Sequence, residues 1–129
     1  MRILLITNDW LPKKGGISTY LTNLVSSVDH EFIIYAPSWA EGDNVINSSS
    51  TFFLNSKDTI NEISEIIKSK NIDIILHGSS NPQFLLIGKL DQISNINSPK
   101  NIKIPQFMIC HGAEFNVLNF IPLLRTILK

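Results

Sequence analysis

Short apolar runs alternate along the 129-residue chain with segments in which apolar residues recur three and four positions apart. The apolar runs predict strands at residues 3–7, 32–36, 72–76 and 106–110, with a shorter strand at 51–54. The helical spacing predicts helices that begin near Ile17, Lys57, Gln83 and Leu118. Because strands that alternate with helices are typical of α/β proteins, we expect a Rossmann-like, doubly wound parallel sheet with helices on both faces.

The first two predicted helices each have an apolar face. In the first, this face consists of Ile17, Tyr20, Leu21, Leu24, Val25 and Val28, and the polar side of Ser18, Thr22, Asn23 and Ser26. The second helix begins at Ser56 or Lys57, and its apolar face consists of Ile60, Ile63, Ile66 and Ile67. Residues 38–50 and 95–101 are rich in Ser and Asn, and we interpret them as loops.

Composition and charge narrow the classes of protein that fit. With 43% hydrophobic residues the chain is too apolar for a disordered segment, and residues 1–129 contain no linker, which indicates one domain. A formal net charge of +0 argues against a nucleic-acid-binding protein. The single cysteine excludes an internal disulfide and favours a reducing, cytoplasmic location. No apolar run approaches the roughly 20 residues that span a bilayer, and no group of His, Asp and Cys has the spacing of a metal site.

Three polar segments directly follow predicted strands, at residues 8–16, 77–81 and 111–114. In a parallel sheet the carboxyl ends of the strands share one edge, and ligands of α/β sheets bind there. We therefore expect the three segments to converge on one ligand site.

Gly15 and Gly16 stand immediately before the first predicted helix. Without side chains they allow a positive φ and let an anion approach the first amides of the helix, whose positive dipole end favours a diphosphate. The alternative is that they only make a tight turn. The chain has neither the Gly-x-Gly-x-x-Gly dinucleotide fingerprint nor a Gly-Lys-Ser/Thr phosphate loop.

Histidines stand at the ends of two predicted strands. His111 follows the last strand, where an imidazole either donates to a sugar or phosphate oxygen or makes only a structural hydrogen bond. Glu114 is placed to orient a hydroxyl or a neighbouring loop. His77-Gly78 repeats the pattern one strand earlier, and we favour a structural role for it. His30 lies beside acidic residues in a turn, and we expect it to face solvent.

Other residues near this edge have simpler interpretations. Cys110 lies inside an apolar strand, so we place it in the core and not in a nucleophilic role. Trp10 and Leu11 either pack beneath their loop, which we favour, or form an acceptor surface near lipid. Lys13 and Lys14 are interpreted as solvated charges, with contact to an acceptor phosphate as the alternative.

Residues 2–21 combine a strand, the turn Pro-Lys-Lys-Gly-Gly-Ile and a helix that carries Tyr-Leu. This arrangement resembles the opening of the retaining GT-B glycosyltransferases of family 4, and His111-Gly112-Ala113-Glu114 is similar to the family's second amino-terminal signature. The Thr-Asn-Asp element at 7–9 and the segment around Ile121-Pro122 are most similar to mannosyltransferases that act on phosphatidylinositol mannosides. Leu11 departs from the family pattern, in which an aromatic residue or proline is common at this position.

The resemblance implies an enzyme that transfers a hexose, such as mannose, from a nucleotide diphosphate sugar to an acceptor hydroxyl, with retention and without a metal. His111 is the implied catalytic residue, in contact with the transferred sugar or the acceptor. Gly15 and Gly16 would bring helix amides to the diphosphate or to an acceptor phosphate. Asp9 would accept a hydrogen bond from an acceptor hydroxyl, and Glu114 would bind substrate beside it.

The resemblance also implies a second domain, because the family's site lies between two Rossmann-like domains. The chain has neither the Arg/Lys pair that holds the donor diphosphate nor the paired glutamates that contact ribose and sugar. We therefore expect an incomplete amino-terminal, acceptor-side domain that is inactive alone, self-associates and depends on a carboxy-terminal domain or a complementing chain. A glycolipid acceptor would add peripheral contact with the inner face of the membrane.

Two alternatives stay open on the sequence alone. One is a non-catalytic fragment or subunit that completes its site with a separate donor-binding partner. The other is a different nucleotide-cofactor-binding Rossmann domain, such as a nicotinamide-dependent dehydrogenase, against which the missing fingerprint counts.

Overall fold

Five parallel strands form one sheet in a computed structural model of the protein, which describes residues 1–79, 86–90 and 104–110. The strands are β1 (Arg2–Ile6), β2 (Glu31–Ala36), β3 (Val45–Asn47), β4 (Ile74–His77) and β5 (Gln106–Met108). They lie in the order β3-β2-β1-β4-β5, so the chain builds outward from β1 first on one side and then on the other. The strand order therefore reverses between β1 and β4, and the predicted doubly wound parallel sheet is confirmed.

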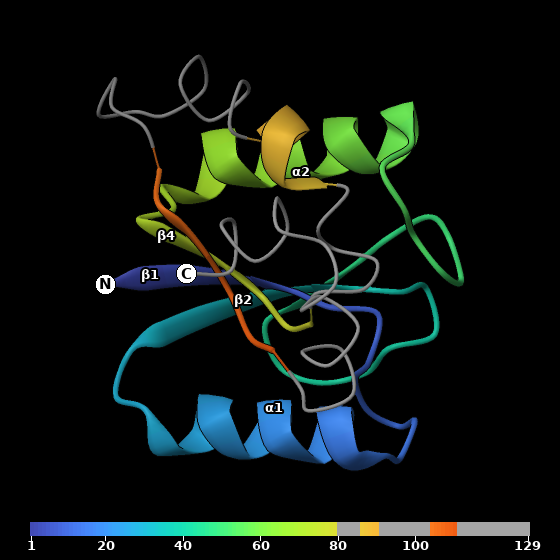
Figure 1. The fold of residues 1–129 in the computed structure, drawn as a ribbon, viewed down its shortest axis with the longest axis vertical. Helices are drawn as coiled ribbons and strands as arrows, with labels where there is room; N and C mark the ends of the chain where they lie inside the picture. Colours follow the sequence, from blue (N-terminus) through green and yellow to red (C-terminus); the bar gives the residue numbers. More distant parts are fainter. Residues whose placement is uncertain (80–85, 91–103, 111–129) are drawn as a thin grey trace, which may run out of the picture.

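Helices cover both faces of the sheet. α1 (Gly16–Ser27) lies on one face and α2 (Lys57–Lys70) on the other, with a helical turn at residues 86–90 beside α2 (Figure 1). The predicted helix from Gln83 to Ile93 is thus confirmed at 86–90, while its ends, the loop 95–101 and the helical tail lie outside the described residues. Among the described helices, none is long and apolar enough to cross a membrane.

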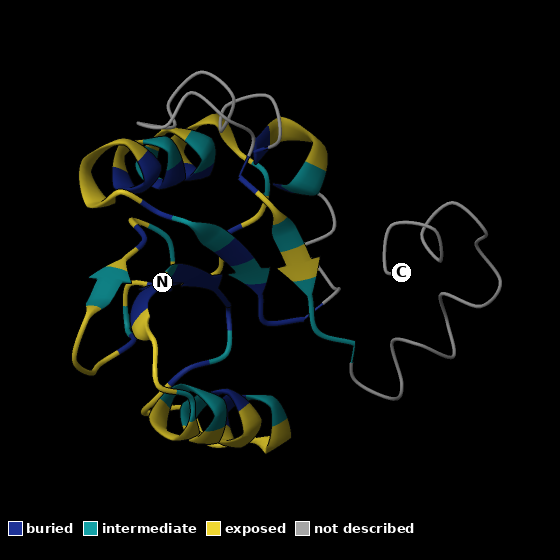
Figure 2. Cartoon of the chain, turned by 90° about the vertical axis from the view of Figure 1, so that its left-hand side faces the viewer, coloured by how far each residue is buried: buried dark blue, intermediate teal, exposed yellow. Residues whose placement is uncertain are grey.

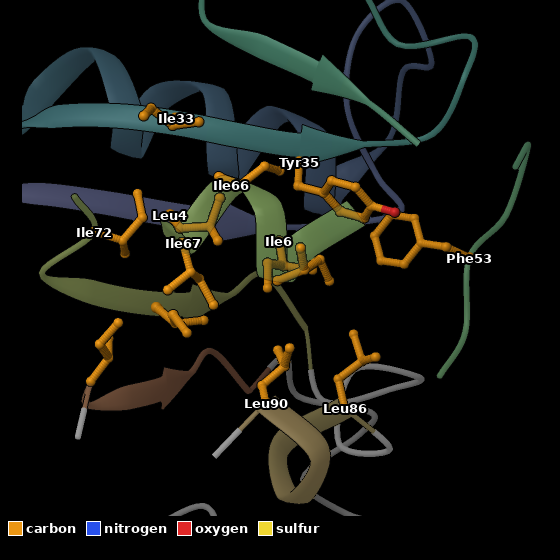
Figure 3. Close-up of a cluster of buried hydrophobic side chains, with 13 residues drawn as sticks. Leu4, Ile6, Ile33, Tyr35, Phe53, Ile66, Ile67, Ile72, Leu86 and Leu90 are labelled. Atoms are coloured by element: carbon orange, nitrogen blue, oxygen red, sulfur yellow. The ribbon is translucent and has the colours of Figure 1, made fainter. Parts of the chain in front are cut away.

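Two clusters of buried apolar side chains hold these helices to the sheet. On the α2 side, Leu4 and Ile6 of β1 pack in one cluster with Leu86 of the helical turn (Figure 3). On the α1 side, Leu5 packs in a second cluster with Leu21 of α1. Because β1 and β2 are buried on both faces (Figure 2), their sequences are continuous apolar runs without the alternation of a half-exposed strand.

The third strand is not where the sequence pattern placed it. β3 lies inside the segment 38–50, which was predicted to be a loop, whereas 51–54 does not form a strand. Ile46 stands opposite Tyr35 in the register and packs against the α2-side cluster, and this contact holds the short edge strand. Phe53 is fully buried, with its ring centroid 4.8 Å from that of Tyr35. The apolar residues at 51–54 thus supply a core anchor in a loop.

The apolar face that the sequence predicted for α1 is wrong at two positions. Tyr20, predicted on the apolar face, is 49% exposed, and Ser18, predicted on the polar side, is buried. Ser18 lies three residues before the buried Leu21 and shares its face, whereas Tyr20 is turned about 100° away from Leu21. Hydrogen bonds from the Ser18 hydroxyl to the carbonyls of Lys13 (2.8 Å) and Gly15 (3.2 Å) offset the cost of burying it.

α2 begins where the sequence predicted. Ser56 is the residue that caps it, and its hydroxyl accepts a hydrogen bond from the amide of Thr59. The predicted apolar face is confirmed, with buried Ile63, Ile66 and Ile67 and half-buried Ile60.

A hydrogen-bonded pair, Tyr35 and Glu62, ties β2 to α2. The Tyr35 hydroxyl donates to Oε1 of Glu62 at 2.6 Å, and the Ser49 amide donates to the same carboxylate at 3.3 Å. Burial alone would raise the pKa of Glu62, but these hydrogen bonds outweigh it and lower that pKa. Burial and the neighbouring carboxylate raise the pKa of Tyr35, so its phenol remains the donor. The pair therefore fastens the segment after β3 to α2.

Removing the Tyr35 hydroxyl should weaken the fold in a pH-dependent way. We expect Tyr35→Phe to lower the free energy of unfolding by about 2 kcal/mol at pH 7, a typical value for a hydrogen bond to a charged group. Folding lowers the pKa of Glu62, so its carboxylate stabilises the protein above the ordinary pKa of 4.5, and this stabilisation is lost as the pH falls through the folded pKa. In urea unfolding, the difference between variant and wild type should therefore shrink as the pH falls below 4.5 and through the lowered pKa of Glu62.

The control for this prediction is Thr19→Val, which replaces a hydroxyl with a methyl group at an exposed position on α1. We expect it to change stability by about 0.5 kcal/mol or less. A Tyr35→Phe loss that is the same at pH 7 and pH 3 would contradict the assignment of the carboxylate as acceptor.

Candidate functional site

The exits of three strands lie side by side at the carboxyl edge of the sheet. Ile6, His77 and Met108, the last residues of β1, β4 and β5, are neighbours in the register. The Gly78 amide donates to the Ile6 carbonyl at 2.9 Å, and the Ile109 amide donates to the His77 carbonyl at 3.0 Å. The predicted convergence is therefore confirmed up to Gly78 and Ile109, while residues 111–114 lie outside the described part of the chain.

Gly78 is where the segment after β4 comes closest to its neighbours. A Cβ placed there would lie 2.8 Å from Cδ1 of Leu21 and 3.0 Å from Cβ of Thr7. Only glycine therefore lets this segment pack against both the exit of β1 and the first helix. The sequence singled out His77-Gly78 as structural, and the glycine has this structural role.

The Thr-Asn-Asp element is held by hydrogen bonds of its own side chains. Oγ1 of Thr7 accepts from the Asp9 amide at 2.9 Å and donates to the Asp9 carbonyl at 3.1 Å. The Asn8 side chain is buried and pairs with the backbone of Phe53, donating to its carbonyl at 2.9 Å and accepting from its amide at 3.0 Å. Sequence reasoning missed this role of Asn8, for which the only local signal is an amide directly after a buried strand.

Asp9 places a carboxylate at this edge. Its Oδ1 lies 2.9 Å from Nζ of Lys13, and the Asp9 side chain is 23% exposed. Lys13 is therefore ion-paired and not simply solvated as predicted, whereas Lys14 is exposed. Asp9 thus gives the site a partly exposed hydrogen-bond acceptor.

Trp10 and Leu11 have different environments. Trp10 is buried and packs in the α1-side cluster, so the packing predicted for it is confirmed. Gly42, at φ 141°, lets the backbone pass close to the indole, because a Cβ there would lie 3.3 Å from Nε1 of Trp10. Leu11 is 43% exposed, so the packing predicted for it is wrong.

Gly15 and Gly16 open onto free space at the start of α1. The expectation of a positive φ is wrong, because Gly15 is extended at φ 174° and Gly42 is the positive-φ glycine of the described residues. A Cβ at either position would meet nothing within 4 Å. No side chain caps the helix and its first turn carries no acidic residue. The start of α1 is thus exposed and has no capping side chain, an arrangement that suits an anion.

His77 is fully buried, and the Nε2 of its imidazole lies 2.9 Å from Oε1 of Gln106. Nδ1 is buried without a hydrogen-bond partner. Burial lowers the pKa of His77 to about 4, which the hydrogen bond to Gln106 opposes only in part. The imidazole is therefore neutral near pH 7.

The remaining sequence predictions concern residues that lie at one or the other edge of the sheet. β5 ends at Met108, so Cys110 lies beyond the strand and is half-buried, not inside the core as predicted. His30 is exposed as predicted, at the amino edge. A hollow of about 370 Å³ at that edge is lined by His30, Arg2 and Asp73 among others, and none of the predicted site residues lines it. In residues 1–79, 86–90 and 104–110, no group of three His, Cys, Asp or Glu side chains is placed to hold a metal ion.

No protein-family model matches the chain, but its sequence is similar to curated mannosyltransferases. The GDP-mannose-dependent alpha-(1-6)-phosphatidylinositol monomannoside mannosyltransferase of Mycobacterium tuberculosis is 32% identical over 100 residues, covering 66% of this chain and 26% of that protein. The enzyme of the same name from Mycolicibacterium smegmatis is 29% identical over 97 residues, which cover 65% of this chain and 25% of that protein. The resemblance to the family 4 glycosyltransferases is confirmed.

A third relative in family 4 acts on an acylated acceptor, by its name. It is the GDP-mannose-dependent monoacylated alpha-(1-6)-phosphatidylinositol monomannoside mannosyltransferase of Corynebacterium glutamicum, 28% identical over 102 residues that cover 70% of this chain and 27% of that protein. The chain spans about a quarter of the length of these family 4 relatives.

The close approach at Gly78 predicts a large effect of a single methyl group. We expect Gly78→Ala to lower the free energy of unfolding by about 1–3 kcal/mol, because Thr7 and Leu21 must move to admit the Cβ. Gly88→Ala is the matched control, since a Cβ there meets nothing within 4 Å and alanine favours the helical turn. Equal stability of the two variants in urea unfolding would contradict the close approach.

The buried neutral imidazole predicts a pH dependence of stability. Below the ordinary pKa of 6.5 the unfolded chain takes up a proton at His77, but the folded protein does not until about pH 4, so stability falls with pH in this window. We expect His77→Gln to remove this part of the slope, up to about 1.4 kcal/mol per pH unit, in urea unfolding between pH 7 and pH 4.5. The exposed control His30→Gln should retain the wild-type slope, and a His77→Gln slope equal to wild type would contradict burial of the neutral ring.

Proposed function

We propose that the chain is the acceptor-side, amino-terminal domain of a glycosyltransferase that transfers mannose from GDP-mannose to a hydroxyl of a phosphatidylinositol mannoside, with retention. The names of the relatives support the donor and the acceptor. The observation that carries the proposal is the open, uncapped start of α1 at the edge where the exits of β1, β4 and β5 meet.

The start of α1 suits the charge that such a reaction must stabilise. As the bond between sugar and diphosphate breaks, negative charge grows on the departing oxygen. The first amides of a helix and its dipole favour an anion at that place. With no Cβ at Gly15 or Gly16, a diphosphate or an acceptor phosphate would approach these amides directly. The scheme uses no metal.

Asp9 is proposed to accept a hydrogen bond from an acceptor hydroxyl. Its side chain is partly exposed at the carboxyl edge, beside the ammonium group of Lys13. The two hydrogen bonds between Thr7 and the Asp9 backbone hold it in place. Such prior positioning of a polar group is what transfer to a single hydroxyl requires.

His111 and Glu114 complete the proposed site. They stand directly beyond Cys110 in the sequence, and the resemblance to the family assigns His111 contact with the transferred sugar and Glu114 contact with substrate. The position of Ile109 beside the β4 exit supports this assignment, because His111 follows Ile109 by two residues. The donor half of the site would come from a second domain or a complementing chain.

Exposed apolar side chains near this edge suit a lipid-linked acceptor. Leu11 is 43% exposed, Phe52 57% and Leu54 44%, and the Asn8–Phe53 hydrogen bonds hold their two loops together. Apolar side chains presented in this way favour peripheral contact with a membrane surface. We propose that the protein works at the inner face of the membrane.

A bulky side chain at the start of α1 should abolish transfer without harming the fold. We expect Gly16→Val to reduce mannose transfer at least a hundredfold, because it closes the approach to the helix amides, while the unfolding midpoint changes little. The assay follows radiolabel from GDP-mannose into vesicles that contain phosphatidylinositol mannosides, with the gene expressed together with its flanking DNA so that a donor-binding partner is supplied.

Lys14→Val is the matched control, a valine in the same exposed loop at a residue outside the proposed site. It should retain transfer within about threefold of wild type. Undiminished transfer by Gly16→Val would refute the role of the helix start. A wild-type protein that binds NADH and not GDP-mannose in a fluorescence titration would favour a cofactor domain instead.

A further inference from the structure

His77 connects three elements at the carboxyl edge. It is the last residue of β4, and its Nε2 lies 2.9 Å from Oε1 of Gln106 on β5. Nε2 of Gln106 in turn donates to the carbonyl of Ile87, in the helical turn 86–90, at 3.0 Å. The His77 carbonyl accepts from the Ile109 amide at 3.0 Å, just past the end of β5. We call His77, Gln106 and Ile87 the His77 network.

The network determines where the imidazole proton lies. The carbonyl of Ile87 only accepts hydrogen bonds, so the amide nitrogen of Gln106 must face it and the amide oxygen must face His77. An amide oxygen also only accepts, so Nε2 of His77 carries the proton and Nδ1 carries the lone pair. Burial, which holds the pKa of His77 at about 4, opposes a second proton.

The imidazole at position 77 is costly to bury. Nδ1 is buried without a partner, and a buried polar atom without a hydrogen bond destabilises the fold. In return, His77 holds β5 at two places. Its ring contacts Gln106 on the strand, and its backbone carbonyl accepts from the Ile109 amide just past the strand's end. The same strand end continues into Gly78, which packs against Thr7 and Leu21.

We propose that His77, as the neutral ring protonated on Nε2, is a positioning residue: its ring ties the start of β5 and the helical turn 86–90 to the end of β4, and this sets where the exit of β5 lies beside the exit of β1. This inference rests on the proposed function, in which the residues that follow β5 carry His111. His77 acts through its neighbours and does not touch substrate.

Histidine-selective nitrogen NMR of the full chain tests the network directly. The three histidines, His30, His77 and His111, give three ring signals that single substitutions assign. We expect the His77 ring to be protonated on Nε2 and unprotonated on Nδ1 at pH 7. A His77 ring protonated on Nδ1 would overturn the proposal.

Two variants at position 77 separate positioning from simple space filling. His77→Gln keeps a donor toward Gln106 and should leave the His111 signals unchanged, whereas His77→Phe keeps a ring without the donor and should shift them. The buried control Ile75→Val, on the same strand, should not shift them. If His77→Phe does not fold, Gln106→Leu removes both side-chain hydrogen bonds and should shift the same signals. His111 signals that stay unchanged in the folded variants without the donor would overturn the proposal.

The transfer assay adds a readout that a merely structural role would not change. We expect the variants without the donor to lower kcat roughly tenfold to a hundredfold at an unchanged KM for GDP-mannose, with recovery in His77→Gln. A kcat equal to that of Ile75→Val would overturn the proposal. If the NMR results hold but the wild-type protein transfers no mannose, the proposed function fails and the network stands.

Discussion

Contact between Gly78 and the exit of β1 is the constraint on which the carboxyl edge depends. At the point where the strand order reverses, no side chain fits between the segment after β4 and its neighbours Thr7 and Leu21. Thr7 begins the long loop toward Gly15, and Leu21 anchors α1 in its cluster. One missing Cβ therefore sets how near the first helix lies to the later strands at this edge.

The sheet could be predicted from the sequence because its inner strands are buried on both faces. This burial makes β1 and β2 continuous apolar runs, which differ plainly from the helical spacing of α1 and α2. The meeting of the strand exits at one edge could be predicted because parallel strands all end at the same edge of a sheet, and no sequence motif was needed. The start of α2 could be predicted to within one residue, because Ser56 is a local start signal that the structure uses as an N-cap.

The errors arose where distant residues decide the outcome. β3 depends on packing against the α2-side cluster, and the buried Phe53 beside it left a strand-like apolar pattern in a loop. The prediction of a positive φ at Gly15 was wrong. The backbone there is extended, and the lack of a side chain instead leaves the space next to the start of α1 empty. Asn8 and Gln106 act on residues far along the sequence, which no local pattern indicates. The roles of His111 and Glu114 stay predictions, since they lie outside the described residues.

The side chain of Asn8 pairs with the backbone of Phe53 much as a neighbouring strand would. The loop after β1 and the loop after β3 thereby form one rigid rim, in which Asn8 and Phe53 hold each other in place. Substitutions at the outward-facing positions, such as Leu11 and Phe52, would therefore leave the rim intact.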